Sequence, residues 1–479
     1  MNYKMVFHTI GQILKVEAAL LVLPLIVNFI YREPNFLAFI LPIGLLLGVG
    51  ILLTIKKPQK TTIYAREGFV IVGLSWIIMS LFGALPFIIS REIPNFFDAF
   101  FETVSGFTTT GASIVPNVEA MSKGMLFWRS FTHWIGGMGV LVFVLAVLPN
   151  SDGKSIYLLR AESPGPQVGK LVSKVRFTAR ILYCIYVVIT LIQIIFLVCG
   201  EMDLYESIVH SFATAGTGGF GIKNDSMTGY SSYSQVVTSI FMVIFGINFS
   251  IFYLLLIGNI KDVFKNEELR YYLGILLVST VIITIDIIGR YASAALAIRD
   301  SFFQVSSIMT TTGFSNTDFN TWPSLSKFIL IFLMFIGASA GSTGGGIKVS
   351  RFIILIKSIG RQIKSLIHPR SVSAIRFEGK PLDEEVVKGV NVYFVTLMTI
   401  FVVGIFLVSF DGMSFEANFT AVAACINNIG PGLAEVGPYY NFNGYSYFSK
   451  VVLTFSMLLG RLEIFPILLL FSPRTYSNR

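Results

Sequence analysis

The stretch DAFFETVSGFTTTGAS, residues 98–113, recurs in three further versions along the 479-residue sequence. The other versions are ESIVHSFATAGTGGFG (206–221), DSFFQVSSIMTTTGFS (300–315) and EANFTAVAACINNIGPG (416–432). When the four are aligned on a shared glycine, an acidic residue lies thirteen or fourteen positions upstream and a small residue six positions upstream. The aligned glycines are Gly111, Gly219, Gly313 and Gly430. Four copies in register indicate one structural unit that is used four times.

Apolar segments flank each copy on both sides. The segment after each copy carries a phenylalanine five residues before a second aligned glycine, in FTHWIG, FMVIFG, FLMFIG and FSMLLG. These second glycines are Gly136, Gly246, Gly337 and Gly460. The copies themselves are too short and too polar to cross a bilayer, so we expect each to be a re-entrant segment between two spans. The sequence predicts an N-terminal helix pair at 1–60 and four such units at 61–150, 170–260, 268–360 and 385–472.

The composition is that of a membrane protein. Apolar residues make up 54% of the chain and charged residues 13%, about half the charged share of a soluble domain. About ten segments have the length of roughly 20 residues that crosses a bilayer core. They lie near 10–31, 35–55, 67–89, 126–148, 178–200, 236–258, 271–289, 326–357, 390–410 and 450–471. Because Glu17 interrupts the first and no small-residue cleavage site follows it, we expect a retained span rather than a signal peptide. We predict an all-α polytopic membrane protein with about ten transmembrane helices and four pore-loop units around a pseudo-fourfold axis.

The net charge of +9 is unevenly distributed. With ten crossings and the N-terminus inside, one side carries the basic connections at 56–60, 154–180, 261–270 and 357–388. The positive-inside rule makes that side cytoplasmic, together with both termini. Topology and anionic membrane lipid account for the basic bias, so no nucleic acid partner is expected.

Residues for enzymatic chemistry are not grouped in the sequence. The three cysteines and four histidines are scattered, which predicts neither a disulfide framework nor a metal cluster. We find no nucleophile–base pair at membrane depth, so we predict that the protein is not an enzyme.

Re-entrant backbone at membrane depth is tolerated only where it is buried in protein or lines a water-filled cavity. Removing a small ion from water costs on the order of 20 kcal/mol in the idealised limit, and backbone carbonyl oxygens from four loops can offset that cost. Glycine permits the backbone angles that such loops need, and the loops hold no acidic side chain. Backbone oxygens suit a monovalent cation better than Ca²⁺ or Mg²⁺.

A lone Thr-Thr-Gly is usually a helix C-cap, but four matched copies favour a selectivity filter. The predicted filter residues are Thr109, Thr110, Gly111, Thr217, Gly218, Gly219, Thr311, Thr312, Gly313, Asn428, Ile429 and Gly430.

The stretch ASAGSTGGGIKVSR, residues 338–351, superficially resembles a phosphate-binding loop. Such a loop has lysine directly after its last glycine and a strand before it, whereas here Ile347 intervenes and an apolar span precedes. We expect instead that the stretch breaks the second helix of the third unit, where the other units continue as helix, and acts as a gate. A static kink is the alternative. The gate residues are Gly341, Ser342, Thr343, Gly344, Gly345 and Gly346.

Basic residues lie close to this stretch and in the last apolar segment. Arg461 follows Gly460, and an arginine within a span usually faces a cavity or a partner. We expect it beside the cation path, as part of the gate; an ion pair with Glu463 or a carbonyl cap is the alternative. Lys348 is a secondary gate candidate that, with Arg351, could snorkel to the cytoplasmic interface. We expect His133 to be structural rather than part of a proton relay.

The motifs TTTGAS, HWIGGMG (133–139), TTTGFS, ASAGSTGGGIKVSR and NNIGPG resemble those of the membrane subunit of Trk-type bacterial potassium uptake systems. The resemblance extends over essentially the whole chain, and the additional N-terminal pair favours the Trk branch over the Ktr branch. It implies a potassium-permeable pore, a homodimer, a cytosolic nucleotide-binding ring that regulates transport, and a location in the bacterial cytoplasmic membrane. The family also carries an intramembrane loop and a pore-facing arginine at the positions described above. Glycine in all four loops marks potassium-selective members, and serine in the first loop marks sodium-carrying relatives.

These observations predict uptake of K⁺, with Rb⁺ as a second permeant ion, through a channel-like pore. One alternative is a cation-coupled secondary transporter with a midplane site, which would act as a symporter. Another is the same fold carrying sodium, against which Gly111 argues.

Overall fold

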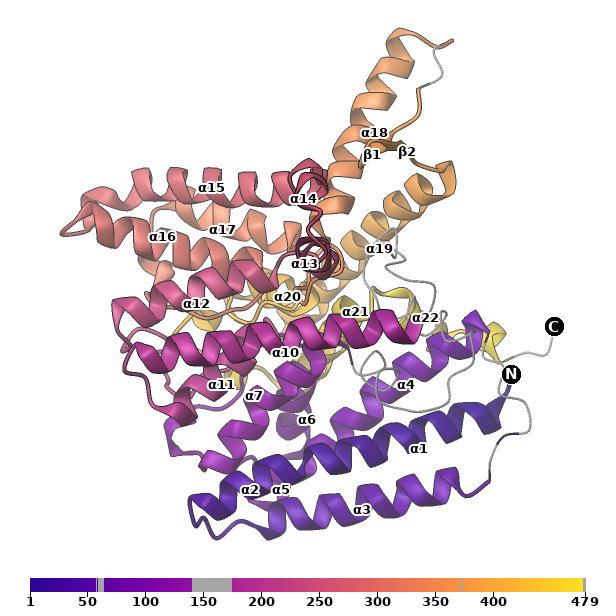
Figure 1. Ribbon diagram of the computed structural model, residues 1–479, viewed down its shortest axis with the longest axis vertical. Coiled ribbons are helices and arrows are strands. Elements are labelled where there is room, and N and C mark those ends of the chain that lie inside the picture. Colours follow the sequence, from indigo (N-terminus) through magenta and orange to yellow (C-terminus); the bar gives the residue numbers. More distant parts are fainter. Residues whose placement is uncertain (57, 59–63, 140–174, 371–372, 477–479) are drawn as a thin grey trace.

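The computed structural model describes residues 1–56, 58, 64–139, 175–370 and 373–476, and nearly all of its regular structure is helical (Figure 1). Two of the expected basic connections, 56–60 and 154–180, fall largely outside these residues. The end of the expected span at 126–148 does so as well.

The N-terminal pair forms one edge of the molecule (Figure 1). It comprises α1 (Tyr3–Leu20), α2 (Val22–Ile30) and α3 (Leu37–Thr54). The helices α1 and α3 approach closely because glycines face each other, and a Cβ added at Gly11 would lie 3.0 Å from the carbonyl oxygen of Gly50. The pair then packs on the first unit through α4.

Each of the four units contains three helices in order, and the middle one, here called the short helix, has 12 to 16 residues. The first helices are α4 (Ala65–Gly83, extended by α5, Leu85–Ile89), α10 (Val175–Cys199), α15 (Glu267–Ile287) and α19 (Glu384–Val408). The short helices are α6 (Phe96–Phe107), α11 (Leu204–Ala215), α16 (Ala294–Met309) and α20 (Phe415–Ile426). The second helices are α7 (Lys123–Gly137), α12 (Ser232–Phe245), α17 (Ser324–Ile336) and α21 (Tyr447–Arg461).

The starting points of the short helices follow from local sequence. Each helix begins after a residue whose side-chain oxygen accepts a hydrogen bond from a backbone N–H of the first turn, and this N-cap stabilises the helix by about 1 kcal/mol. The caps are Asn95, Asp203, Ser293 and Ser414. Each short helix ends four residues before the aligned glycine of its copy.

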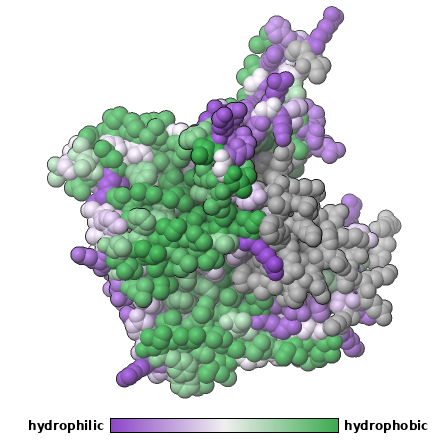
Figure 2. Space-filling model, viewed as in Figure 1, coloured by the Kyte–Doolittle hydropathy of each residue, from purple (hydrophilic) through white to green (hydrophobic). Residues whose placement is uncertain are grey.

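Six helices in the described part of the chain are long and apolar enough to cross a membrane, and a seventh candidate is the pair α12 and α13 (Phe249–Leu256), bent by 91°. The six lie at Tyr3–Ile30, Leu37–Thr54, Arg66–Ile89, Thr178–Cys199, Glu267–Arg290 and Glu384–Asp411. Apolar side chains cover the face formed by α10, α12, α15 and α16, as expected of a surface in contact with lipid (Figure 2). These findings support a multi-pass membrane protein, and the number of about ten crossings stays a prediction.

The second helices account for the difference in number, and they correct one expectation. We expected a break only in the third unit, but α12 ends before Gly246, α17 ends before Gly337 and α21 ends one residue after Gly460. The helix resumes with α13, α18 (Val349–Ile367) and α22 (Phe465–Phe471), respectively. The third unit therefore differs in the length of its break, not in having one.

Close packing explains why glycine lies at these breaks. A Cβ added at Gly136 would lie 1.9 Å from the carbonyl oxygen of Phe107, and one added at Gly460 would lie 2.0 Å from that of Ile426. Phe107 and Ile426 are the last residues of α6 and α20. In the first and fourth units the second helix thus contacts the end of the short helix of its own unit, where a side chain does not fit.

The third unit also extends away from the helical body. The helix α18 and a hairpin of β1 (Arg376–Phe377) and β2 (Lys380–Pro381) project from it, next to α19 (Figure 1). The connections contain α14 (Ile260–Lys265) and short 3₁₀ helices at Val118–Ala120, Ile288–Arg290, Phe319–Thr321, Ser409–Asp411, Ala434–Val436, Phe442–Gly444 and Pro473–Thr475.

Candidate cation pathway

The four loops after the short helices share one backbone conformation. The residue two positions before each aligned glycine has a positive φ, between 53° and 57°, and the glycine itself has a φ between 76° and 103°. The non-glycine residues with this conformation are Thr109, Thr217, Thr311 and Asn428. Such angles are uncommon for residues with a side chain, so their recurrence at four equivalent positions indicates a constrained loop.

Backbone hydrogen bonds hold each loop to its helix. The N–H of the residue before each aligned glycine donates to the carbonyl of the small residue that recurs six positions upstream, over 2.8–2.9 Å. The acceptors are Ser105, Ala213, Ser307 and Ala424. This is the hydrogen bond of a helix C-cap that ends in a left-handed residue. Each Thr-Thr-Gly segment and its equivalents therefore form a helix C-cap, as the local sequence indicated.

The loops contact one another in a closed ring. A Cβ added at Gly111 would lie 1.9 Å from the carbonyl oxygen of Gly218. In the same way, a Cβ added at Gly219 would lie 2.2 Å from the carbonyl oxygen of Thr312. One added at Gly313 would lie 2.1 Å from that of Ile429, and one added at Gly430 would lie 2.7 Å from that of Thr110. Each glycine therefore lies against the equivalent carbonyl of the next loop, and the last loop contacts the first. Any larger residue at these positions would displace backbone.

The backbone around the four aligned glycines carries carbonyl oxygens without a donor in the described part of the chain and borders a cavity. No donor among the described residues is hydrogen-bonded to the carbonyl oxygens of Thr110, Gly218, Thr312 or Ile429. All four aligned glycines also line a single cavity of about 110 Å³, together with residues that follow each loop. Uncharged backbone oxygens next to such a cavity are the groups that can replace the hydration shell of a monovalent cation.

The glycine-rich stretch lies against the ends of the short helices rather than against the four glycines. The N–H of Gly345 donates to Thr311 Oγ1 over 2.6 Å, and a Cβ added at Gly345 would lie 2.4 Å from the carbonyl oxygen of Asn427. A Cβ added at Gly344 would lie 2.9 Å from the carbonyl oxygen of Thr310. The stretch is thus in contact with the third and fourth loops where they leave their helices.

Hydrogen bonds to the second unit hold the glycine-rich stretch in place. The N–H of Ser339 donates to Gly246 over 3.1 Å, and the N–H of Phe249 donates to Gly341 over 3.0 Å. The buried carboxylate of Glu268 accepts from the N–H of Ala340 over 2.7 Å. The breaks of the second and third units are therefore paired, which gives partners to backbone groups that a helix would otherwise satisfy.

Lys348 and Arg351 do not snorkel, so that expectation was wrong. Both are buried, and Lys348 Nζ donates to the carbonyl of Gly344. Arg351 forms a two-pronged ion pair with Glu463, with distances of 3.0 and 2.5 Å, and its guanidinium lies 4.2 Å from the ring centre of Tyr393. The physical reason is that the broken helices provide carbonyl and carboxylate acceptors within hydrogen-bond distance of both side chains.

Arg461 joins three of the units. Its guanidinium donates to the carbonyl of Thr343 over 2.9 Å in the glycine-rich stretch and to that of Gly137 over 2.7 Å at the end of α7. It also donates to the carbonyl of Gly136 and, over 3.2 Å, to Thr109 Oγ1 in the first loop. Of the alternatives, carbonyl contacts are present, whereas Glu463 pairs with Arg351 instead. The structure thus brings Arg461, the glycine-rich stretch and the first loop together.

His133 has the surroundings of a structural residue. Its Nδ1 is 2.7 Å from the carbonyl oxygen of Gly106, and its ring packs 4.2 Å from that of Phe220. It lies against the backbone of Gly216 and Gly218, where it fills space beside the second loop.

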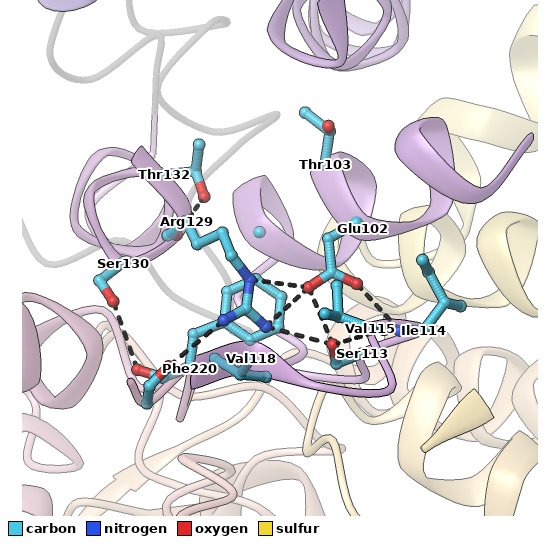
Figure 3. Close-up of polar contacts among 12 residues, drawn as sticks. Glu102, Thr103, Ser113, Ile114, Val115, Val118, Arg129, Ser130, Thr132 and Phe220 are labelled. Atoms are coloured by element: carbon cyan, nitrogen blue, oxygen red, sulfur yellow. Dashed lines mark hydrogen bonds and ion pairs between the residues drawn. The ribbon is translucent and has the colours of Figure 1, made fainter. Parts of the chain in front are cut away.

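One pair beside the ring was missed by the sequence reasoning. Glu102 of α6 and Arg129 of α7 form a buried ion pair with a closest distance of 2.7 Å (Figure 3). The signal that could have revealed it is a pair of opposite charges inside two neighbouring apolar segments, since isolated charges there are costly.

The spans and loops define a helical, multi-pass membrane protein in which the aligned glycines of four loops line one cavity. The chain belongs to the TrkH family of cation transport proteins, whose model matches residues 35–288 and 275–479. This membership confirms the resemblance to Trk-type systems and the prediction that the protein is a transporter, not an enzyme.

Individual relatives match over the full length. The Trk system potassium uptake protein TrkH of Escherichia coli strain K12 is 36% identical over 482 residues, 99% of each chain. TrkG of the same strain is 33% identical over 98% of each chain. The crystal structure of the potassium transporter TrkH from Vibrio parahaemolyticus superposes with a TM-score of 0.90 at 32% identity, over 100% of both chains. This likeness confirms the predicted all-α polytopic fold.

Proposed function

We propose that the protein takes up K⁺ across the cytoplasmic membrane of a bacterium through a channel-like pore with a backbone-carbonyl filter. The observation that carries the proposal is the closed ring in which each aligned glycine lies against a carbonyl oxygen of the next loop, while the four glycines line one cavity. The relatives named potassium uptake proteins support the choice of ion. The membrane potential supplies about 2.3 kcal/mol per charge per 100 mV, so uptake needs no hydrolysis in this chain.

The filter in this proposal consists of the twelve residues predicted from the sequence, three from each unit. Glycine at all four aligned positions supports selectivity for K⁺ and Rb⁺. A serine in place of Gly111 would put its Cβ 1.9 Å from the carbonyl oxygen of Gly218, so the backbone of the first two loops would have to move apart. This gives a physical reason why the residue at this position would separate potassium-selective members from sodium-carrying ones.

The gate in this proposal is Gly341–Gly346 with Arg461 and Lys348. The stretch lies beneath the ends of two short helices, and its contact with Arg461 supports a closed state in which protein occupies the path. Opening would move the stretch away from Thr311 and Thr343 away from the guanidinium. A fixed positive charge at that point raises the barrier for a cation as long as it faces the path.

Regulation and assembly rest on the resemblance. A homodimer and a cytosolic nucleotide-binding ring are proposed, with both termini cytoplasmic. The projecting region of α18 and the hairpin lies in the basic connection 357–388, which supports it as a docking surface. The connection at 149–177 is also long and basic and is a second candidate for docking, but it lies almost entirely outside the described residues.

The test is flux into liposomes that contain the purified protein, under gradients of K⁺, Rb⁺, Na⁺ or Li⁺, with Gly313→Ser alongside. Uniport of K⁺ and Rb⁺, with Na⁺ and Li⁺ excluded until the substitution is made, is the expected result. A requirement for a second ion gradient would instead identify a coupled secondary transporter, and the glycines would then serve packing.

A further inference from the structure

At one position behind its loop, the first copy carries a carboxylate that the other three copies lack. Glu102 lies nine residues before Gly111, within the short helix behind the loop. The equivalent positions in the other three copies hold His210, Gln304 and Ala421. The four loops are therefore similar in conformation, but the side chains behind them at this position differ from copy to copy.

Glu102 is 1% exposed, and both of its carboxylate oxygens are hydrogen-bonded (Figure 3). Its Oε1 accepts from Ser113 Oγ over 3.0 Å and from Arg129 Nε over 2.9 Å, and its Oε2 accepts from the N–H of Ile114 over 2.9 Å. Ser113 and Ile114 follow the first aligned glycine. The carboxylate thus holds the first loop where the chain leaves the ring.

Arg129 extends the same contact to the second loop. Its Nη2 donates to Ser113 Oγ over 3.2 Å, and its Nη1 donates to the carbonyl of Gly221 over 3.3 Å. Its guanidinium also lies 4.1 Å from the ring centre of Phe220. Ser113 and Gly221 are each two residues beyond their aligned glycines, so one guanidinium contacts equivalent positions of adjacent loops.

The pair lies beside the closest contact in the ring. Of the four glycine-to-carbonyl approaches, the one from Gly111 to Gly218 is the shortest, at 1.9 Å for an added Cβ. Arg129 also lines the cavity that the four glycines share. A change in the separation of the first two loops would therefore act directly on two of the four carbonyl oxygens.

We propose that Glu102 and Arg129 are positioning residues that set the distance between the first and second loops, and thereby the preference for K⁺ over Na⁺. Charge-assisted hydrogen bonds are shorter and about twice as strong as neutral ones, which suits them to fix backbone that must not relax around a smaller ion. The inference rests on the proposed function, since it assigns a selectivity role within the proposed filter.

The experiment measures the Na⁺-to-K⁺ permeability ratio in liposomes for Glu102→Gln, Arg129→Lys and Ser113→Ala. Ser113→Ala removes the hydroxyl contacts of the loop and leaves the ion pair and the N–H of Ile114, so it keeps the test decisive if Glu102→Gln does not fold. Glu33→Gln is the matched control, because Glu33 accepts from the N–H of Gly124 over 3.1 Å at the start of the same helix α7 but does not touch the loops.

We expect the ratio to rise about tenfold in Glu102→Gln, the equivalent of one charge-assisted hydrogen bond, and about threefold in Ser113→Ala. The melting temperature of Ser113→Ala should equal that of the wild type, and Glu33→Gln should leave the ratio unchanged. A purely structural role would lower the melting temperature and leave the ratio intact.

Three results overturn the inference. An unchanged ratio in folded Ser113→Ala and Arg129→Lys, beside a selective wild type, rejects the positioning role alone. An equal rise in Glu33→Gln assigns the change to general loosening of α7. A wild type without K⁺ flux or without selectivity rejects the proposed function itself, and the inference with it.

Discussion

Neutralising Arg461 tests the gate most directly. The guanidinium lies 3.2 Å from Thr109 Oγ1, so an ion that passes this hydroxyl comes within about 6 Å of the charge. At an effective dielectric constant of about 20, two unit charges at that distance repel by about 3 kcal/mol, which corresponds to about a hundredfold in rate. Because salt and the spread of the charge reduce this repulsion, we expect Arg461→Gln to raise K⁺ flux about tenfold to a hundredfold.

The same substitution also removes hydrogen bonds to the carbonyls of Thr343 and Gly137, which hold the glycine-rich stretch against the first unit. Arg461→Lys separates the two effects because it keeps the charge but cannot form the same fork of bonds. Rubidium uptake into liposomes at matched protein density is the assay. Slower flux in Arg461→Gln would refute the barrier. An equal increase in Arg461→Lys would assign the effect to the lost tethers rather than to the charge.

Three further expectations follow from other parts of the structure. Shortening Gly341–Gly346 should raise flux through the isolated protein, and unchanged flux would remove its gating role. Gly460→Ala should destabilise the fold by about 1–3 kcal/mol, because the added methyl would lie 2.0 Å from a carbonyl oxygen. Gly48→Ala is the control and should not destabilise the fold, because its methyl meets no atom within 4 Å. Thermal unfolding of both variants in detergent measures the difference. A hydrogen bond from the serine that caps α20 lowers the pKa of Glu435 below its usual 4.5, so its stabilising contribution is present above that pH and is lost as pH falls through the lowered pKa. The difference in melting temperature between wild type and Glu435→Gln should therefore shrink on acidification below about pH 4, and a difference that is constant with pH would contradict this.

The sequence by itself determined the class of protein and the geometry of each loop. Long apolar segments require a bilayer, and the matched copies define where each short helix ends. The cap at Asn95 and the bond from Thr110 to Ser105 join residues within six positions of each other, so the local sequence suffices to specify them. The resemblance of the same motifs to Trk-type systems then identified the family, and the full-length relatives confirmed it.

Only the tertiary structure decided which groups lie together across units. The carbonyl of Gly218 lies against Gly111, more than one hundred positions earlier, and no periodicity in the sequence encodes that contact. Arg351 could have snorkelled to the membrane interface, yet it is buried in an ion pair with Glu463, more than one hundred positions later in the chain. A side chain at membrane depth pairs with the nearest acceptor in space, because the surrounding lipid offers no other. The identity of that acceptor is therefore a property of the packed units and not of any one segment.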